Sequence, residues 1–365
     1  MHPMLFATLV ALAKIVLILF MFIMAIATLL TWAERKQSAV LQDRIGANRA
    51  DFMGFRLWGL LNIAADGIKS FTKEDWVPPT GNPIIHNLAP FIGLFGAMVS
   101  FAVIPFGPPL QLFGQTFTLQ LVDLNIGLLY ILAFGSMGIY SVVLAGWSSN
   151  NKFAQLGALR GICQMISYEV VLGLSLIGVI LVTGSVRLPE IIAYQGQYWL
   201  GGWIPKWGIF TQPLAFLLFL PAAIAETKRV PFDVPEGESE IIGYFVEYSG
   251  LKFGLFLLGE FIEIVVLAAF ISVLFFGGWQ VPWLTDAGFQ FGSALSIPLS
   301  EWLVATLRIL GFIAKVIFFC MLQLQIRWTL PRFRFDHLLR LGWKEMMPLA
   351  LLNVFITAIV MYVLS

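Results

Sequence analysis

The sequence predicts an all-α integral membrane protein, and this prediction rests on composition and on the length of the apolar runs. Hydrophobic residues make up 59% of the 365 and charged residues only 12%, whereas a soluble domain has about 25% charged residues. The mean hydropathy is +0.87. The apolar runs are continuous and reach the roughly 20 residues that a spanning helix needs, unlike the short alternating strands of a membrane β-barrel. We therefore expect a single polytopic membrane domain over residues 1–365, without a soluble domain.

Eight runs along the chain are candidates for membrane-spanning helices. They lie near residues 5–32, 84–106, 122–146, 161–184, 208–226, 253–276, 302–326 and 345–364. The fifth is the least regular, because Gln212, Pro213 and Pro221 interrupt it and proline removes helical hydrogen bonds.

The distribution of basic residues predicts how the chain is oriented. Seventeen of the 22 Lys and Arg residues fall in the first, third, fifth and seventh loops between these spans. Loops rich in Lys and Arg stay on the cytoplasmic side of a membrane. We therefore expect both termini on the non-cytoplasmic side, and long cytoplasmic loops near residues 33–83, 227–252 and 327–344.

The first loop contains an amphipathic segment. Its apolar residues recur at three- and four-residue spacings: Phe55, Trp58, Leu61, Ala65, Ile68 and Phe71. This pattern predicts a helix that lies at the membrane interface. Two interpretations stay open from the spacing alone. The helix either anchors the chain at the interface or forms one wall of a portal through which a lipid-like molecule enters.

Two glutamates inside the expected spans are hard to explain as packing residues. Glu169 lies in the fourth span and Glu226 ends the fifth, and a charge at such depth costs roughly 2.5–3.5 kcal/mol. Neither has a basic residue at helical spacing in its own span. A carboxyl group in this position is suited to carrying a proton near neutral pH.

A second group of intramembrane charges allows two interpretations. Glu260 and Glu263 lie on one face of the sixth span, and Arg308 and Lys315 on one face of the seventh. The acids either pair with these bases and fix the packing of the two helices, or they belong to a functional site.

The fifth loop is unusually acidic for so apolar a chain. Its carboxylates, counted from the end of the fifth span, are Glu226, Asp233, Glu236, Glu238, Glu240 and Glu247. They alternate with apolar residues such as Val230, Phe232 and Ile241, a pattern that predicts burial. Crowded, half-buried carboxylates titrate as a coupled set, and such a set responds to any charge brought near it. The loop is thus suited to linking a redox or binding event to protonation.

The chain offers few residues for a cofactor of its own. Cys163 and Cys320 lie in separate spans, and the three histidines include no pair suited to haem ligation within the membrane. There is no phosphate loop and no dinucleotide-binding fingerprint. We expect no metal or redox cofactor in this chain and no nucleic-acid partner, so any electron chemistry belongs to a partner subunit.

A set of motifs in fixed order resembles a known family. The motifs are ERK at 34–36, RIGANR at 44–49, AADGIKSFTKED at 64–75, IPFGP at 104–108, AGWSSNNKFAQLGALR at 145–160, QMISYE at 164–169, ETKRVPFDVPEGESEIIGYFVEYSG at 226–250, FFGGW at 275–279 and RWTLPRFRFDHLLRLGWK at 327–344. They cover nearly the whole chain. The sequence resembles the H-subunit family of proton-pumping NADH:quinone oxidoreductase (respiratory complex I), the membrane subunits at the quinone site.

This resemblance implies a function that composition does not. The protein would form the membrane part of a quinone-binding tunnel in a multisubunit translocase of the bacterial plasma membrane, and it would not be catalytic alone. Quinone is the implied substrate. Iron–sulfur clusters and FMN would belong to peripheral partner subunits, and other membrane subunits and the lipid bilayer are the remaining implied partners.

The resemblance also implies roles for particular residues. A polar route for protons would comprise Glu34, Asp66, Glu169, Glu226, Asp233, Glu236, Glu238, Glu240 and Glu247. The quinone tunnel and its interface with the peripheral arm would comprise Arg35, Phe55, Trp58, Asp66, Phe232, Arg327, Arg332 and Arg334. The amphipathic helix would then border the lipid-side entrance.

The sequence departs from the family pattern at three places. Ala47 stands where the family commonly has proline, and Asn62-Ile63-Ala64 replaces another proline-containing stretch beside the expected entrance. Some relatives carry an acid in the third span, where this chain has Ser136.

Two other functions remain as alternatives. The chain could be the membrane anchor of a related hydrogenase-type complex, which does not use quinone, or a stand-alone proton or cation transporter. Neither the electron donor nor the quinone type follows from this sequence.

Overall fold

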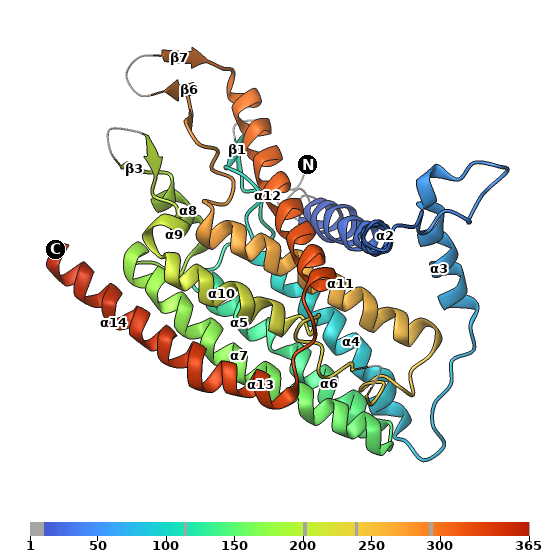
Figure 1. Ribbon diagram of the computed structural model, residues 1–365. Helices are drawn as coiled ribbons and strands as arrows, with labels where there is room; N and C mark the ends of the chain where they lie inside the picture. The colour runs from blue at the N-terminus through green and yellow to red at the C-terminus, as the bar shows by residue number, and fades with distance from the viewer. Residues whose placement is uncertain (1–10, 113–114, 200–202, 238–239, 292–294, 365) are drawn as a thin grey trace.

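The computed structural model describes residues 11–112, 115–199, 203–237, 240–291 and 295–364. Over these ranges the chain is a tilted bundle of long helices (Figure 1). The predicted all-α membrane class is confirmed. Within the described residues, seven helices are long and apolar enough to cross a membrane: Ala11–Leu41, Pro83–Val103, Gly127–Ser148, Lys152–Thr183, Gly250–Phe275, Glu301–Thr329 and Phe335–Val363.

The helices and strands follow one another in a simple order. The helices are a π-helical stretch (Val16–Met24), α2 (Ala25–Leu41), a 3₁₀ turn (Leu57–Gly59), α3 (Leu61–Thr72), α4 (Pro83–Ser100), a second 3₁₀ turn (Phe101–Val103), α5 (Gly127–Gly135), α6 (Met137–Ser148), α7 (Lys152–Thr183), α8 (Leu188–Gln195), α9 (Gly208–Thr211), α10 (Pro213–Glu226), α11 (Gly250–Phe275), α12 (Glu301–Thr329), α13 (Phe335–Arg340), a π-helical turn (Leu341–Met346) and α14 (Met347–Leu364).

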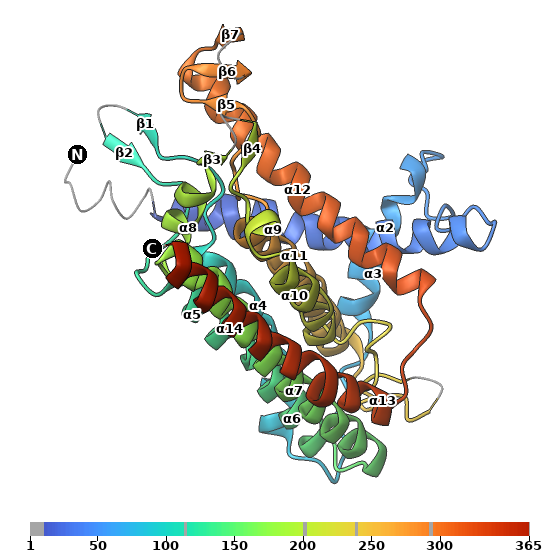
Figure 2. The same cartoon turned by 60° about the vertical axis from the view of Figure 1, so that its left-hand side comes forward.

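The strands are short and form three small antiparallel sheets. Their bounds are β1 (Leu110–Leu112), β2 (Gln115–Phe117), β3 (Tyr198–Trp199), β4 (Ile204–Pro205), β5 (Leu284–Thr285), β6 (Gly288–Phe291) and β7 (Leu295–Pro298). β1 pairs with β2, β3 with β4, and β6 with both β5 and β7. They gather at one end of the bundle in both views (Figures 1 and 2), while α3 and α13 lie at the other. We call the end with α3 and α13 the basic end, and the strand-bearing end the opposite end.

The ends of two spanning helices show how local sequence sets their limits. The side chain of Asn82 accepts hydrogen bonds from the backbone N–H groups of Ile84 and Ile85, and Pro83 occupies the first turn of α4, where its missing N–H costs nothing. Asn151 caps α7 in the same way through Phe153. Gly184 ends α7 with φ of +70°, a conformation that glycine adopts without strain.

The fifth expected span differs from the prediction. Residues 208–226 form the single turn α9 and the 14-residue helix α10, which are separated at Gln212. A helix of 14 residues is about 21 Å long, whereas the apolar core of a bilayer is about 30 Å thick. The chain beyond Glu226 therefore continues at membrane depth, and its polar groups must find partners inside the protein.

The centre of the bundle is α11. Most of its residues from Gly259 to Phe275 are buried, and the same helix contacts α2, α4 and α12. Its deepest acidic residues, Glu260 and Glu263, therefore face protein on all sides rather than lipid. This position makes α11 the scaffold on which the candidate site is built.

The predicted amphipathic helix is present, but it begins later than its apolar pattern suggested. α3 starts at Leu61 and lies at the edge of the bundle, where it contacts α2 and α11 (Figure 1). It carries no buried residue, and the apolar side chains of Ile68 and Phe71 are exposed. An uncovered apolar face of this kind suits contact with lipid or with an apolar ligand.

Candidate functional site: buried ion pairs that lead to a carboxylate cavity

The segment after α10 places two bases in the protein interior. Thr227, Lys228 and Arg229 follow the short helix directly, and their exposed fractions are 1%, 4% and 6%. Buried bases of this kind need anionic partners, because an unpaired charge in a medium of low dielectric constant is strongly disfavoured. Both bases find such partners on neighbouring helices.

Arg229 joins α2 to α11. Its Nη1 lies 3.2 Å from Glu34 Oε2 on α2, and its Nη2 lies 3.3 Å from Glu260 Oε2 on α11. The guanidinium also lies 4.4 Å from the ring centre of Phe261, a cation–π distance. Glu34 has a second partner, since Arg327 Nη1 on α12 lies 2.9 Å from its Oε1. The expected site residues Glu34 and Arg327 thus meet in one network.

Glu260 is the meeting point of α11 with the acidic loop. The hydroxyl of Tyr244 donates a hydrogen bond of 3.3 Å to Glu260 Oε1. Glu236 lies beside the same carboxyl, and burial together with this neighbour raises the pKa of Glu236 well above its usual value. Glu260 belongs to α11, so this contact joins the loop to the helix, and the coupled titration of the loop acids stays a prediction.

Lys228 leads from this network toward the membrane centre. Its Nζ lies 3.7 Å from Glu263 Oε2, one helical turn along α11 from Glu260. Glu263 in turn lines a small cavity. The network therefore runs from Glu34 on α2 to a space in the middle of the bundle.

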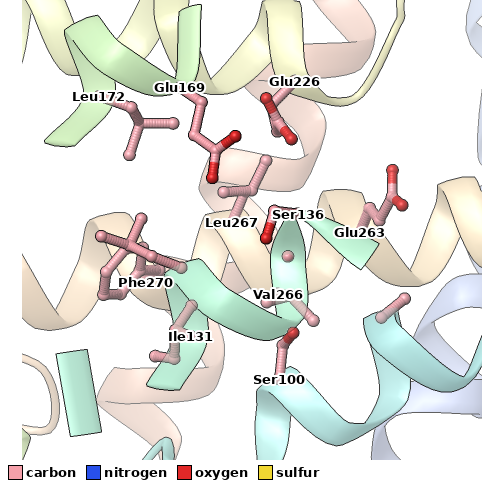
Figure 3. A pocket seen from close by; sticks show the side chains of 13 residues that line it. Ser100, Ile131, Ser136, Glu169, Leu172, Glu226, Glu263, Val266, Leu267 and Phe270 are labelled. Atoms are coloured by element: carbon pink, nitrogen blue, oxygen red, sulfur yellow. The ribbon is translucent and has the colours of Figure 1, made fainter. Parts of the chain in front are cut away.

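That cavity collects three carboxyl groups in an otherwise apolar wall. Its lining residues are Ala97, Ser100, Ile131, Leu132, Gly135, Ser136, Glu169, Leu172, Glu226, Glu263, Val266, Leu267 and Phe270. Figure 3 shows Glu169 from α7 and Glu226 from α10 reaching into the same space, with Ser136 beside them. The cavity volume is about 50 Å³, which is enough for a few water molecules. Within the described part of the chain, neither Glu169 nor Glu226 forms an ion pair with a base.

The hypothesis that the acids of the sixth span pair with the bases of the seventh is wrong. Glu260 and Glu263 pair with Arg229 and Lys228 of the loop. Lys315 donates instead to the backbone carbonyl groups of three residues that follow α11. Arg308 pairs with Asp286 at the opposite end, at 2.7 Å.

The expected entrance residues lie together beside α2 and α3. Arg35 and Asp66 form an ion pair of 2.7 Å, in which both side chains are nearly half exposed. Next to it is a hollow of about 360 Å³, lined by Lys36, Asn48, Arg56, Leu57 and Trp58. Phe55 and Trp58 are strongly exposed, at 71% and 83%.

A close backbone contact shapes the segment before α3. Gly59 has φ of +89°, and a Cβ atom added to it would lie 1.9 Å from the carbonyl oxygen of Ala47. Only glycine fits here. Ala47, one of the positions that depart from the family pattern, thus forms the wall against which Gly59 closes the loop.

Three further expected tunnel residues lie at the junction of the acidic loop with the segment after α12. Arg332 Nη2 lies 2.7 Å from Asp233 Oδ2. Phe232 is buried between Tyr168 and Phe333, with ring centres 5.4 Å away from each. Arg334 differs, because it is 77% exposed and pairs with Asp336 on the surface. Arg334 therefore lies outside the buried network and is available to a partner subunit.

Two other loop acids, Glu240 and Glu247, do not line the cavity. Glu240 is 63% exposed and pairs with Arg160 at 2.7 Å. Glu247 accepts a hydrogen bond of 2.6 Å from the amide of Asn151. Glu238 lies outside the described residues.

Sequence reasoning missed the pivotal roles of Lys228, Arg229, Glu260 and Tyr244. A signal for them did exist. Two bases directly after an interrupted span, together with two acids on one face of the next span, are consistent with pairing between loop and helix. The interruption at Gln212 was the further indication that this loop starts at membrane depth.

Comparisons with known proteins agree with this architecture. Residues 13–358 match the NADH dehydrogenase family. The chain is 43% identical to NADH-quinone oxidoreductase H-subunit 1 of Cytophaga hutchinsonii, over 94% of each chain. It is 44% identical to H-subunit 1 of Geobacter metallireducens, over 95% of this chain and 94% of that one. It is 42% identical to the H-subunit of Thermomicrobium roseum, over 91% of this chain and 90% of that one. With spanning helices, near-complete coverage and this level of identity, the chain belongs to the H-subunit family of NADH-quinone oxidoreductase, the membrane subunits of that multisubunit enzyme.

Proposed function

We propose that this chain forms the membrane part of the quinone-binding tunnel and couples quinone reduction to proton translocation through its buried carboxylates. One observation carries the proposal. Charged side chains follow one another from Glu34 through Arg229 and Glu260 to Lys228 and Glu263, and Glu263 lines the cavity that also holds Glu169 and Glu226.

The entrance fits a molecule with a polar head and an apolar tail. The hollow beside α2 carries the basic side chains of Lys36 and Arg56, which suit quinone oxygens, and the indole of Trp58. The exposed apolar residues of α3, such as Ile68 and Phe71, continue this surface toward the lipid. Asp66 and Arg35 stand between that surface and Glu34, so they are suited to sensing the headgroup as it passes.

The electrostatics of the buried network supply the coupling. Two unit charges 4 Å apart interact by about 4 kcal/mol at an effective dielectric constant of about 20. Negative charge that develops on a quinone near Glu34 would therefore weaken the ion pair between Arg229 and Glu260. Glu236, whose pKa is raised by burial beside Glu260, would then take up or release a proton, and Lys228 would pass the change in charge to Glu263.

The carboxylate cavity would receive these protons. Glu169, Glu226 and Glu263 face one another across room for a few water molecules, and hydroxyl groups of Ser100 and Ser136 lie in the same wall. Carboxyl groups, hydroxyl groups and water are the components of a proton relay. Ser136 stands where some relatives have an acid, and its place in this wall supports a relay role for that position.

Partners complete the reaction in this proposal. Quinone is the substrate, and the iron–sulfur clusters and FMN that deliver electrons belong to peripheral subunits at the basic end, where Arg334 is exposed. No metal or redox cofactor is assigned to this chain, and no nucleic acid is involved. Neighbouring membrane subunits surround it in a bacterial plasma membrane, with both termini on the non-cytoplasmic side.

Photoaffinity labelling of the assembled complex tests the tunnel. A long-tailed quinone that carries a photoreactive group should crosslink to this chain within residues 32–66, and excess unlabelled quinone should suppress that labelling. Labelling confined to other subunits would contradict the proposal. Coupling is tested separately by the substitutions described in the Discussion.

A further inference from the structure

The end of α11 that faces away from the basic end is held by a buried glutamine and a partly buried lysine. Gln195 donates a hydrogen bond of 2.8 Å to the carbonyl of Val273 and accepts one of 2.9 Å from the N–H of Gly277. Lys315 on α12 donates to the carbonyl oxygens of Phe276, Gly278 and Gln280, at 2.7, 3.0 and 2.6 Å. A helix leaves its last carbonyl groups without partners, so these bonds fix where α11 ends.

The geometry around Lys315 is that of a charged ammonium group. An ammonium has three donors, and each of the three meets one carbonyl oxygen. The ring centre of Trp207 lies 4.6 Å from the same Nζ, which is a cation–π distance. A positive charge at the C-terminal end of a helix is further stabilised by the helix dipole. Lys315 is thus a cation held in a fixed position.

An aromatic layer separates this cation from the carboxylate cavity. It consists of Phe216 and Phe219 of α10, Phe270 and Phe275 of α11, Phe276, and Phe319 of α12. Neighbouring ring centres in this layer are 4.8 to 5.7 Å apart. Phe270 also lines the carboxylate cavity, as Figure 3 shows. The six residue steps from Phe270 to Phe276 correspond to about 9 Å along a helix axis.

Beyond Lys315 lies a polar hollow at the opposite end. Its volume is about 760 Å³, and Trp279, Gln280 and Arg308 are among its lining residues. Gln280 thus faces the hollow while its carbonyl oxygen binds Lys315. Water in this hollow would contact Gln280, the residue whose carbonyl oxygen binds the Lys315 ammonium group. The aromatic layer and Lys315 lie between that water and the carboxylate cavity.

We propose that the aromatic layer and the fixed charge of Lys315 form a proton seal, which stops protons from passing between the carboxylate cavity and the hollow at the opposite end. The inference rests on the proposed function, since only a cavity that carries protons needs such a seal. An apolar layer excludes water chains, and a fixed positive charge repels a proton that enters the layer, as in selective channels. The chain would therefore take protons from the basic end and pass them on without leaking them across.

The test is passive proton permeability of liposomes that contain the assembled complex. A pH gradient is imposed without NADH, the membrane potential is clamped with potassium and valinomycin, and a trapped pH dye reports the leak. The Lys315→Met substitution keeps the length of the side chain and removes its charge. We expect its leak to exceed that of wild type by about 20-fold, the factor for repulsion between unit charges about 9 Å apart at an effective dielectric constant of about 20.

A double substitution shows whether the leak passes through the cavity. Glu226→Gln removes one proton-binding group there. The proton leak of the Lys315→Met/Glu226→Gln complex should therefore return to the wild-type value. The matched control is Arg308→Gln, which removes the other basic side chain in the apolar part of α12 and should not leak. Should Lys315→Met fail to assemble, Phe276→Ser tests the same layer in the same pair of experiments.

Two results would overturn the seal. One is a proton leak no greater than that of wild type in the Lys315→Met complex, or in the Phe276→Ser complex that replaces it. The other is a leak that persists unchanged when Glu226→Gln is added, because it then bypasses the cavity. Failure of the proposed function has a different signature: full NADH-driven pumping in the Glu226→Gln single variant.

Discussion

Arg229 holds Glu34 and Glu260 together although the two carboxylates come from α2 and α11. The distances from its two terminal nitrogens are 3.2 and 3.3 Å, and the side-chain exposures of the three residues are only 7%, 13% and 8%. Carboxylates buried at this depth need cationic partners, and Glu34 has a second one in Arg327. The relationship makes one loop residue the link between the entrance side of the molecule and its central helix.

Replacing Arg229 by methionine should strongly destabilise the chain. Removing one partner of a buried ion pair costs about 3–5 kcal/mol, because the remaining charge stays buried. We expect less assembled complex in the membrane and a lower unfolding temperature after purification. Arg187→Met is the control, since Arg187 pairs with Asp123 and Glu190 near the surface, where ion pairs contribute little. Equal stability of the two variants would contradict the structural importance of Arg229.

Replacing Glu226 by glutamine should leave assembly intact and depress coupled quinone reduction. Glutamine keeps the size of the side chain but cannot carry a proton, and loss of a positioned acid or base lowers rates by about 100-fold or more. NADH-driven acidification of proteoliposomes measures the effect. Glu240→Gln, which changes an acid of the same loop that is 63% exposed, should pump like wild type. Wild-type turnover and pumping in assembled Glu226→Gln would remove this residue from the relay.

Replacing Asp66 by alanine should affect long-tailed quinones more than short ones. Asp66 is paired with Arg35 at the edge of the expected entrance, and the pair is too exposed to matter much for stability. KM values for quinones of increasing tail length measure the effect. Lys69→Ala on the same helix is the matched control, because Lys69 is exposed. Equal changes for short and long tails would argue against an entrance role for Asp66.

Replacing Glu236 by glutamine should change how stability depends on pH. Burial beside Glu260 raises the pKa of Glu236 above the ordinary value of 4.5. Below pH 4.5 this carboxyl is neutral in both the folded and unfolded states. As pH rises from there through the raised pKa, folding holds a proton that the unfolded chain has released, so the wild type loses stability relative to the variant.

Unfolding temperatures between about pH 6 and pH 9 measure this difference. The advantage of the Glu236→Gln complex over wild type should grow as pH rises. An advantage that does not change with pH would show that Glu236 already has an ordinary pKa.

The sequence carried enough information for the spans and for the burial of the acidic loop. Long apolar runs require helices in a membrane, and acids alternating with residues such as Phe232 require a protein surface to cover them. Both expectations follow from the free-energy cost of placing apolar groups in water or charged groups in lipid. Neither requires knowing which helices are neighbours. The same argument identifies Glu169, Glu226 and Ser136 as intramembrane polar residues. It does not show that they share one cavity.

The pairing of charges could not be predicted in the same way. Helical spacing shows that Glu260 and Glu263 share a face of α11, but it does not say which element covers that face. The short α10 brings Lys228 and Arg229 there, and Lys315 is left to the carbonyl groups after α11. Likewise, the exposure of Glu240 and Arg334 depends on the path of two loops, which no local pattern encodes. The short hairpins of the opposite end also had no strong sequence pattern.

The shortness of α10 has an electrical consequence. Because the helix ends at Glu226, polar and charged groups extend from the basic end to the middle of the bundle, and a voltage across the membrane drops little over that half. Most of the drop falls on the apolar half that contains Phe219 and Phe270. Moving one charge through a drop of 100 mV takes about 2.3 kcal/mol. In the proposed function, the carboxylates of the cavity would therefore lie close to the electrical potential of the basic side, largely insulated from the transmembrane voltage.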